Sequence, residues 1–209
     1  MEKKLLLLGG GGHCHSVVDS VLSLGIYDEI GILDSTATLY LGVSVIGTDA
    51  DIPELMQAGW NEAFITVGSV GNTQVRRKLY KMLKGYGLSI PTIIDPTAVV
   101  AKGTQLQEGT FVGKRAVINS GASIGACSII NTGAIVEHDC VVGDFSHISP
   151  GSTLCGQVVV GHDTHVGAGS VVKQLIKIGD SVLIGAGSVV LKDIPSEVKA
   201  YGNPCKVVK

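Results

Sequence analysis

Two histidines and their acidic neighbours, between residues 137 and 147, have the residue types needed for proton transfer. His138 lies directly between Glu137 and Asp139. A neighbouring carboxylate can fix the tautomer of an imidazole and stabilise its protonated form, as a general base requires. His147 follows nine positions later, a spacing that matches neither a helical turn nor one face of a strand. The residues suggest general-base chemistry at His138, and the role of His147 depends on the elements that carry it.

A repeat of six residues organises the second half of the chain. An aliphatic residue recurs at every sixth position from Ile94 to Val190 without an insertion, and small residues dominate four positions after each one. Such a period is the signature of a hexapeptide β-helix, in which each hexad forms one short strand and a corner. An irregular β-sandwich would show varied loop lengths instead. Resemblance to known hexapeptide proteins adds a left hand and three hexads, or 18 residues, per coil.

This lattice predicts which residues stack on neighbouring coils, at the usual strand spacing of about 4.8 Å. His147 and His165 are 18 apart, and each directly precedes an inward aliphatic residue. We therefore expect both to point outward from the prism, one above the other. Asp144 and His162 should stack near a corner in the same way. His138, two positions after an inward valine, is expected at a corner.

The first 93 residues alternate between strand and helix patterns. Residues 3–8, 29–34 and 63–68 read as buried strands, and residues 53–59 and 73–87 read as helices. A further helix follows the glycine run and ends near Gly25. The order predicts a small Rossmann-like parallel α/β domain over residues 1–93. A left-handed parallel β-helix with a short C-terminal tail is expected over residues 94–209.

A ligand of such a domain binds beyond the carboxyl ends of its strands. The run Gly9–Gly12 with His13 precedes the first helix, whose free N–H groups can hold a phosphate. Asp34 ends the second strand and could accept hydrogen bonds from a ribose or a base, and Gly68 ends the third. A strict GxGxxG is absent because position 14 is cysteine, so a tight structural turn remains the alternative to nucleotide binding.

Composition excludes several other classes of function. The 16 basic and 18 acidic residues give a formal net charge of −2 with no basic run, so neither a nucleic-acid partner nor membrane insertion is expected. Five cysteines without CxxC spacing indicate a reduced, cytoplasmic chain. Among the histidines of the repeat only His162 and His165 are close in sequence, and they point from different sites of a coil. No metal is therefore predicted.

The segments "IVEHDCVVGDFSHISPGSTLCG", "LLGGGGH", "GILD" and "YGNPCKVV" together resemble bacterial hexapeptide-repeat acetyltransferases that act on nucleotide-linked amino sugars. That family includes enzymes named as sialic acid O-acetyltransferases, and the resemblance covers nearly the whole chain. It implies a homotrimer with active sites between subunits. Acetyl-CoA would lie along the groove between adjacent β-helices, and the sugar nucleotide would lie on the N-terminal domain.

The resemblance also implies roles for individual residues. His138 matches the catalytic base and Asp139 the carboxylate that raises its basicity, where many relatives have Glu. The family's contacts with the nucleotide sugar match Gly11, Gly12, His13, Asp34, Ser35, Gly68 and Asn131. Its contacts with acetyl-CoA match His147, Ala168 and Ala186. Some relatives have a second acidic residue at position 35, so Ser35 could reflect a different base or sugar.

The expected reaction is transfer of an acetyl group from acetyl-CoA to the C4 amino group of a UDP-linked dideoxy sugar. His138 would remove the amine proton, and a backbone N–H on a coil could hold the oxyanion. One alternative keeps the fold but acetylates a hydroxyl, as in sialic acid O-acetylation. Another is a non-catalytic binding trimer, which would tolerate changes at His138.

Overall fold

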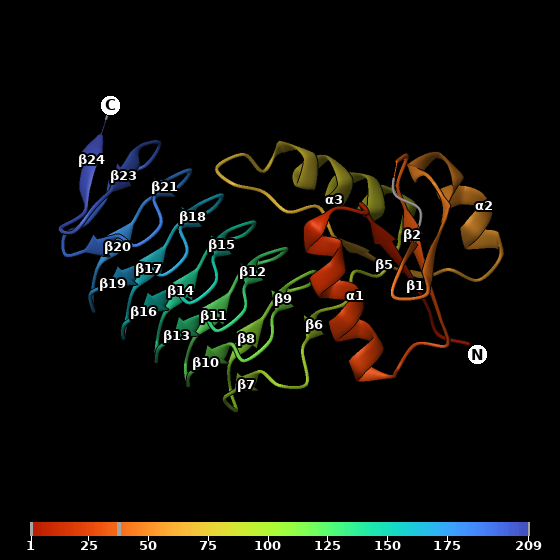
Figure 1. Ribbon diagram of the computed structural model, residues 1–209, viewed down its shortest axis with the longest axis horizontal. Helices are drawn as coiled ribbons and strands as arrows, with labels where there is room; N and C mark the ends of the chain where they lie inside the picture. The colour runs from red at the N-terminus through yellow and green to blue at the C-terminus, as the bar shows by residue number, and fades with distance from the viewer. Residues whose placement is uncertain (1, 37–38, 209) are drawn as a thin grey trace.

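The computed structural model describes residues 2–36 and 39–208, which form two joined parts (Figure 1). The N-terminal part is an α/β domain, and the rest of the chain winds into a three-sided prism of short strands. The coils stack along the long axis of the molecule, and the α/β domain lies against the first of them. The predicted order of the two architectures is confirmed.

The α/β domain is built on a five-stranded sheet of order β3-β4-β2-β1-β5. Its strands are β1 (Lys4–Leu8), β2 (Glu29–Leu33), β3 (Leu39–Tyr40), β4 (Val43–Gly47) and β5 (Glu62–Ile65). The three predicted strands pair in parallel, with β1 at the centre because its leucines are buried on both faces. The prediction of a parallel α/β domain is confirmed, but it omitted β3 and β4, and β3 runs antiparallel to β4.

The described part of this domain also has three helices and one 3-10 turn. They are α1 (Gly12–Leu24), η1 (Asp49–Asp51), α2 (Ile52–Gln57) and α3 (Gln74–Tyr86). The helices α1 and α3 end at Gly25 and Gly87, whose φ angles of 61° and 75° are left-handed and cost glycine little. The predicted helix at 73–87 is one residue longer than α3 at each end.

The prism has three parallel sheets, here called the first, second and third sheets in chain order. The first contains β6 (Ile93–Ile94), β9 (Phe111–Val112), β12 (Ile129–Ile130), β15 (His147–Ile148), β18 (His165–Val166) and β21 (Leu183–Ile184), extended by β23 (Lys199–Tyr201) and β24 (Lys206–Val208). The second contains β7 (Val99–Val100), β10 (Val117–Ile118), β13 (Ile135–Val136), β16 (Thr153–Leu154), β19 (Val171–Val172) and β22 (Val189–Val190). The third contains β8 (Gln105–Leu106), β11 (Ser123–Ile124), β14 (Val141–Val142), β17 (Val159–Val160) and β20 (Lys177–Ile178). The predicted boundary between residues 93 and 94 falls inside β6.

The coil register has the predicted length. Val117 pairs with Ile135, and Ile135 with Thr153, an offset of 18 residues each time. The aliphatic residue of every hexad from Val112 to Val190 is buried and belongs to one continuous core. Buried hydroxyls complete the interior: Ser146 donates to the carbonyl of Gly161 at 2.6 Å, and Ser152 to that of Gly167 at 2.8 Å. The interior is therefore polar only where each polar atom has a partner.

The α/β domain covers the outer face of the first sheet. Ile93, Phe111 and Ile129 point out of the prism and pack with α1 residues such as Val17. The helix α3 binds the edge between the third and first sheets, where Arg77 makes a bidentate ion pair with Asp163 at 2.6–2.7 Å. This junction fixes the α/β domain on one side of the prism.

Candidate active site

His138 lies at the edge between the second and third sheets, in the corner that joins β13 to β14. Its Nδ1 atom lies 2.9 Å from Oδ2 of Asp139, and both side chains are 58% exposed. Asp139 has a φ angle of 59°, an uncommon conformation for a non-glycine residue, which the corner imposes. Glu137 instead binds the Asn119 amide at 3.0 Å and the backbone N–H of His138. Of the two flanking carboxylates, only Asp139 therefore contacts the imidazole.

A groove of about 460 Å³ opens beside His138. It is lined by Glu137, His138, Cys155, Gly156, Gln157, Gln174 and Leu175. Gly156 lies one coil beyond His138, and a Cβ atom there would come within 2.5 Å of Nε2 of the imidazole. The missing side chain is therefore what lets the ring lie across the coil. The prediction did not include Gly156, although the 18-residue lattice gives its position.

His147 and His165 stack as predicted, with paired positions in β15 and β18 and ring centroids 4.9 Å apart. Both point out of the prism, where His147 lies at the junction with the α/β domain and His165 is only 8% exposed. Nδ1 of His147 lies 3.2 Å from the carbonyl of Ser69, and Nε2 lies 3.0 Å from Nδ2 of Asn131. Burial lowers the pKa of His147 to about 4, and the nearby His165 contributes. This imidazole is thus neutral and held on both sides within one chain.

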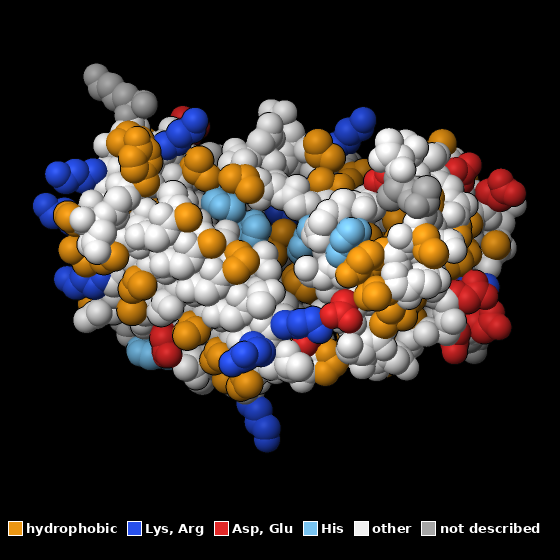
Figure 2. Space-filling view, in the orientation of Figure 1, with side chains coloured by type: hydrophobic (Ala, Val, Ile, Leu, Met, Phe, Trp, Pro, Cys, Tyr) orange, Lys and Arg blue, Asp and Glu red, His pale blue; other side chains and the backbone are white. Residues whose placement is uncertain are grey.

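His13 lies at the same junction, where it contacts Phe111. Figure 2 shows histidine side chains gathered between the two parts. The His13 ring meets Phe111 edge-on at 5.3 Å, and Gly68 lets the backbone approach it closely. Burial lowers the pKa of His13 to about 3, with a further contribution from Arg76. Arg76, only 2% exposed, donates to the carbonyls of Cys127 and Phe145. The junction is therefore a tightly packed polar seam.

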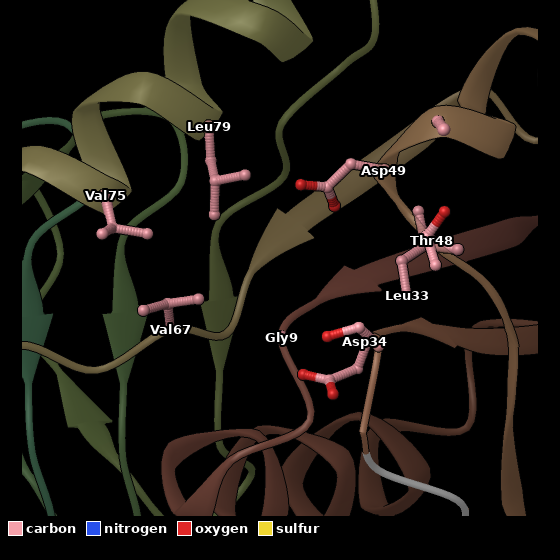
Figure 3. Close-up of a pocket in the computed structure, with 10 residues that line it drawn as sticks. Gly9, Leu33, Asp34, Thr48, Asp49, Val67, Val75 and Leu79 are labelled. Atoms are coloured by element: carbon pink, nitrogen blue, oxygen red, sulfur yellow. The ribbon is translucent and has the colours of Figure 1, made fainter.

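A separate cavity of about 330 Å³ lies at the carboxyl ends of β1, β2 and β4 (Figure 3). It is lined by Gly9, Leu33, Asp34, Ser35, Thr48, Asp49, Ala50, Val67, Val75 and Leu79. Asp34 accepts from the N–H of Gly10 at 2.7 Å and from the N–H of Thr36 at 2.7 Å, so its carboxylate holds the glycine loop. Gly11 and Gly12 begin α1 beside this loop, where added Cβ atoms would meet open space.

The predicted site residues fall into four places. His138 and Asp139 form the pair at the second–third edge, while Asp34 and Ser35 line the cavity and Gly11 and Gly12 begin α1. The seam brings together His13, Gly68, Asn131 and His147. Ala168 and Ala186 are exposed in corners of the first–second edge, stacked through a 2.8 Å hydrogen bond from Gly187 to Ala168. Their individual ligand contacts remain predictions.

Residues 2–36 and 39–208 contain no group of three or more His, Cys, Asp or Glu side chains that could hold a metal ion. Within the same ranges, no helix has the length and apolar character needed to cross a membrane.

Comparisons with known proteins agree with both parts of the fold. A family model described as the PglD N-terminal domain matches residues 4–83, and one described as bacterial transferase hexapeptide (six repeats) matches residues 139–174. No curated protein matches the chain.

Several solved structures are similar over their whole length. A variant of perosamine N-acetyltransferase from Caulobacter crescentus, in complex with CoA and GDP-perosamine, is 36% identical, with 99% of this chain and 97% of that chain covered and a TM-score of 0.93. The acetyltransferase domain of PglB from Neisseria gonorrhoeae, in complex with acetyl coenzyme A, is 33% identical, with both chains fully covered and a TM-score of 0.93. WeeI from Acinetobacter baumannii shares the fold at 24% identity, with 99% of this chain and 100% of that chain covered and a TM-score of 0.87.

The fold and the comparisons define an acyltransferase with an N-terminal α/β domain and a left-handed β-helix, as predicted. The chain belongs to the PglD-like family of hexapeptide-repeat sugar N-acetyltransferases, enzymes that use acetyl-CoA.

Proposed function

We propose that the protein transfers the acetyl group of acetyl-CoA to the C4 amino group of a nucleotide-linked dideoxy sugar, with His138 as the general base. The observation that carries this proposal is the His138–Asp139 pair beside an open groove. Asp139 accepts the Nδ1 proton, so Nε2 presents its lone pair, and no described residue hydrogen-bonds Nε2. Such an imidazole can accept a proton from an incoming amine.

The reaction needs no covalent intermediate on the protein. The amine nitrogen forms a bond to the thioester carbonyl, His138 removes an amine proton, and collapse of the tetrahedral adduct breaks the C–S bond. The leaving CoA sulfur then takes up a proton. Cys140 is fully buried and burial raises the pKa of its thiol to about 11, so it is no nucleophile.

Gly156 supplies a candidate for the oxyanion contact. Its position is next to Nε2 of His138 in the same groove, and its backbone N–H donates no hydrogen bond within the described residues. A free backbone donor in a groove can stabilise the negative charge that develops on the thioester oxygen. The proposal assigns this N–H to the acetyl carbonyl.

The proposed assembly is a homotrimer with active sites between subunits. The α/β domain covers the first sheet, whereas His138 lies at the opposite edge, so the cavity and the base belong to different surfaces of one chain. The outward residues of the second sheet are almost all aliphatic: Val99, Val117, Ile135, Thr153, Val171 and Val189. Such an exposed apolar face is well suited to bind a second copy of the chain. That copy would bring the cavity of its own α/β domain to His138.

The named ligands of the relatives support this substrate class. The Caulobacter structure contains CoA and GDP-perosamine, and the Neisseria structure contains acetyl coenzyme A. By this similarity we place acetyl-CoA in the groove and a nucleotide sugar on residues 1–93. The family is named for N-acetylation, which favours an amine over the hydroxyl acceptor of the alternative reaction. All five cysteines are unpaired, which supports the predicted reducing, cytoplasmic location.

A thiol-release assay tests the proposal. The protein is mixed with acetyl-CoA and a panel of UDP-, GDP- and CMP-linked sugars that carry amines or only hydroxyls. We expect CoA release with a C4-amino sugar, a product whose acetyl group survives mild base, and a 10²–10⁴-fold lower kcat in His138→Ala. Base-labile product would show O-acetylation, and near-normal turnover of His138→Ala would overturn its role. Binding without turnover across the panel would favour the non-catalytic trimer.

A further inference from the structure

The cavity of the α/β domain has apolar walls and a polar end. Val67, Val75 and Leu79 point into it from the β5 side and from α3, and Leu33 forms the opposite wall (Figure 3). Apolar walls facing each other across a cleft suit a planar ring, because both faces of the ring leave water. This cavity is therefore shaped for the base of a nucleotide.

The strand order predicts the direction in which a nucleotide lies. The glycine loop follows β1, which lies between β2 and β5, and precedes the N-terminus of α1, which favours phosphate. Asp34 follows β2, the next strand outward, where the ribose lies in folds of this type. The segment 48–50 follows β4, the next strand again. A base beyond that ribose would lie against residues 48–50.

The carboxylate of Asp49 lies at this end of the cavity and is free to bind a ligand. Thr48 is bound to Asp51 and Asp34 holds the glycine loop, whereas Asp49 makes no hydrogen bond within the described residues. Figure 3 shows its carboxylate turned into the cavity. Partial burial and the charge of Asp34 raise the pKa of Asp49, and Lys78 lowers it.

We infer that Asp49 recognises guanine, so that the substrate is a GDP-linked amino sugar. Guanine presents N1–H and N2–H side by side, and two parallel donors fit the two oxygens of a carboxylate. Uracil presents a single N3–H between two carbonyl oxygens, one of which would face a carboxylate oxygen. The inference rests on the proposed function, because it takes this cavity as the nucleotide site, and it replaces the uridine nucleotide predicted from the sequence.

Calorimetric titration of the full-length protein with GDP, IDP, UDP and CDP tests this inference. IDP keeps the N1–H of guanine and lacks the 2-amino group. We expect GDP to bind about tenfold to a hundredfold more tightly than UDP or CDP, and IDP to fall between them. Asp49→Asn should weaken GDP binding by a similar factor, narrow the gap between GDP and IDP, and change UDP binding little. Glu54→Gln, the same change on the exposed face of α2, is the matched control and should bind GDP normally.

The outcomes separate this inference from the proposed function. Equal or tighter binding of UDP, or equal losses of GDP and UDP affinity in Asp49→Asn, would overturn the guanine assignment. Acetyl transfer to a UDP-linked amino sugar at full rate would do the same while leaving the proposed reaction intact. Guanine preference that depends on Asp49, without acetyl transfer to any amino sugar, would support the inference and contradict the proposed reaction.

Discussion

The second–third edge and the covered first sheet place histidines on the same prism in opposite environments. His138 is more than half exposed, bound by one carboxylate on one side and facing a groove on the other. His147 lies at the seam with the α/β domain and has a partner at each ring nitrogen, and the neighbouring His165 is buried. The first environment leaves a nitrogen available for proton transfer, whereas the second holds a neutral ring as part of the packing.

The difference shows that the hexad lattice alone does not decide what a histidine does. Both His138 and His147 follow the repeat without distortion, and the repeat gives both an outward direction. What separates them is the domain that packs on the first sheet and leaves the second–third edge open. The position of the α/β domain, which leaves the second–third edge open, therefore decides which histidine is available for chemistry.

Among changes to the surroundings of these histidines, the largest effect is expected from Gly156→Ala at the open second–third edge. The new Cβ would lie 2.5 Å from Nε2 of His138, so the exposed ring must move away from the groove. We expect kcat to fall by on the order of 10²–10³-fold, since displacement of a catalytic group by about 1 Å can cost 10²-fold. The unfolding midpoint should change little. Gly85→Ala in α3, where a Cβ meets open space, is the control, and equal kcat in both variants would contradict the account.

The next effect is the pH dependence of stability that arises from His13 and His147 in the seam. Their folded pKa values, about 3 for His13 and about 4 for His147, lie below the ordinary value of 6.5. As the pH falls, the unfolded chain takes up these protons first. The stability that the two neutral histidines contribute is therefore fully present above pH 6.5 and is lost as the pH falls through their folded pKa values. For His147 alone the loss is on the order of 3 kcal/mol.

Denaturant unfolding at pH 7, 6 and 5 measures this loss. His147→Asn cannot take up the proton and should show a shallower decline in the free energy of unfolding than the parent protein. An equal slope in both proteins would show that His147 titrates normally in the folded state and that the seam is not the source of the acid sensitivity.

A smaller effect is expected from Arg76→Met in the seam. The substitution keeps the length of the side chain but leaves the carbonyls of Cys127 and Phe145 without this donor. Losing these bonds destabilises the folded protein. Removing a buried charge that pairs with no carboxylate among the described residues offsets part of the cost. We expect a net loss of about 2 kcal/mol in the free energy of unfolding. Lys81→Met, exposed on the same helix, is the control, and equal stability of the two variants would sink this reading of the seam.

Much of this architecture could be predicted because the repeat is local. An aliphatic residue every six positions specifies strand, corner and register together, which is why the stacking of His147 on His165 was correct. The β4 strand, Val43–Gly47, was missed although it has five residues and pairs with both β2 and β3. Without β4, the segment that carries Asp49 had no predicted place beside the cavity.

Burial of the histidines could not be predicted from the repeat. It arises from contacts between residues far apart in sequence, such as His147 with Ser69 and Arg76 with Phe145. Gly156 is different, because the 18-residue offset from His138 gives its position directly. The stacking of Gly156 on His138 in the next coil could therefore have been used to predict that part of the site.

The central claim is that His138 of one subunit acts on a sugar nucleotide held by the α/β domain of another. Co-expression of two inactive variants with different tags tests it directly: His138→Ala, and Val75→Trp, which fills the cavity from the exposed side of α3. Mixed trimers isolated through both tags contain one site with an intact base and an intact cavity, so we predict up to about one third of the normal kcat per trimer. Mixed trimers no more active than either parent would contradict the claim.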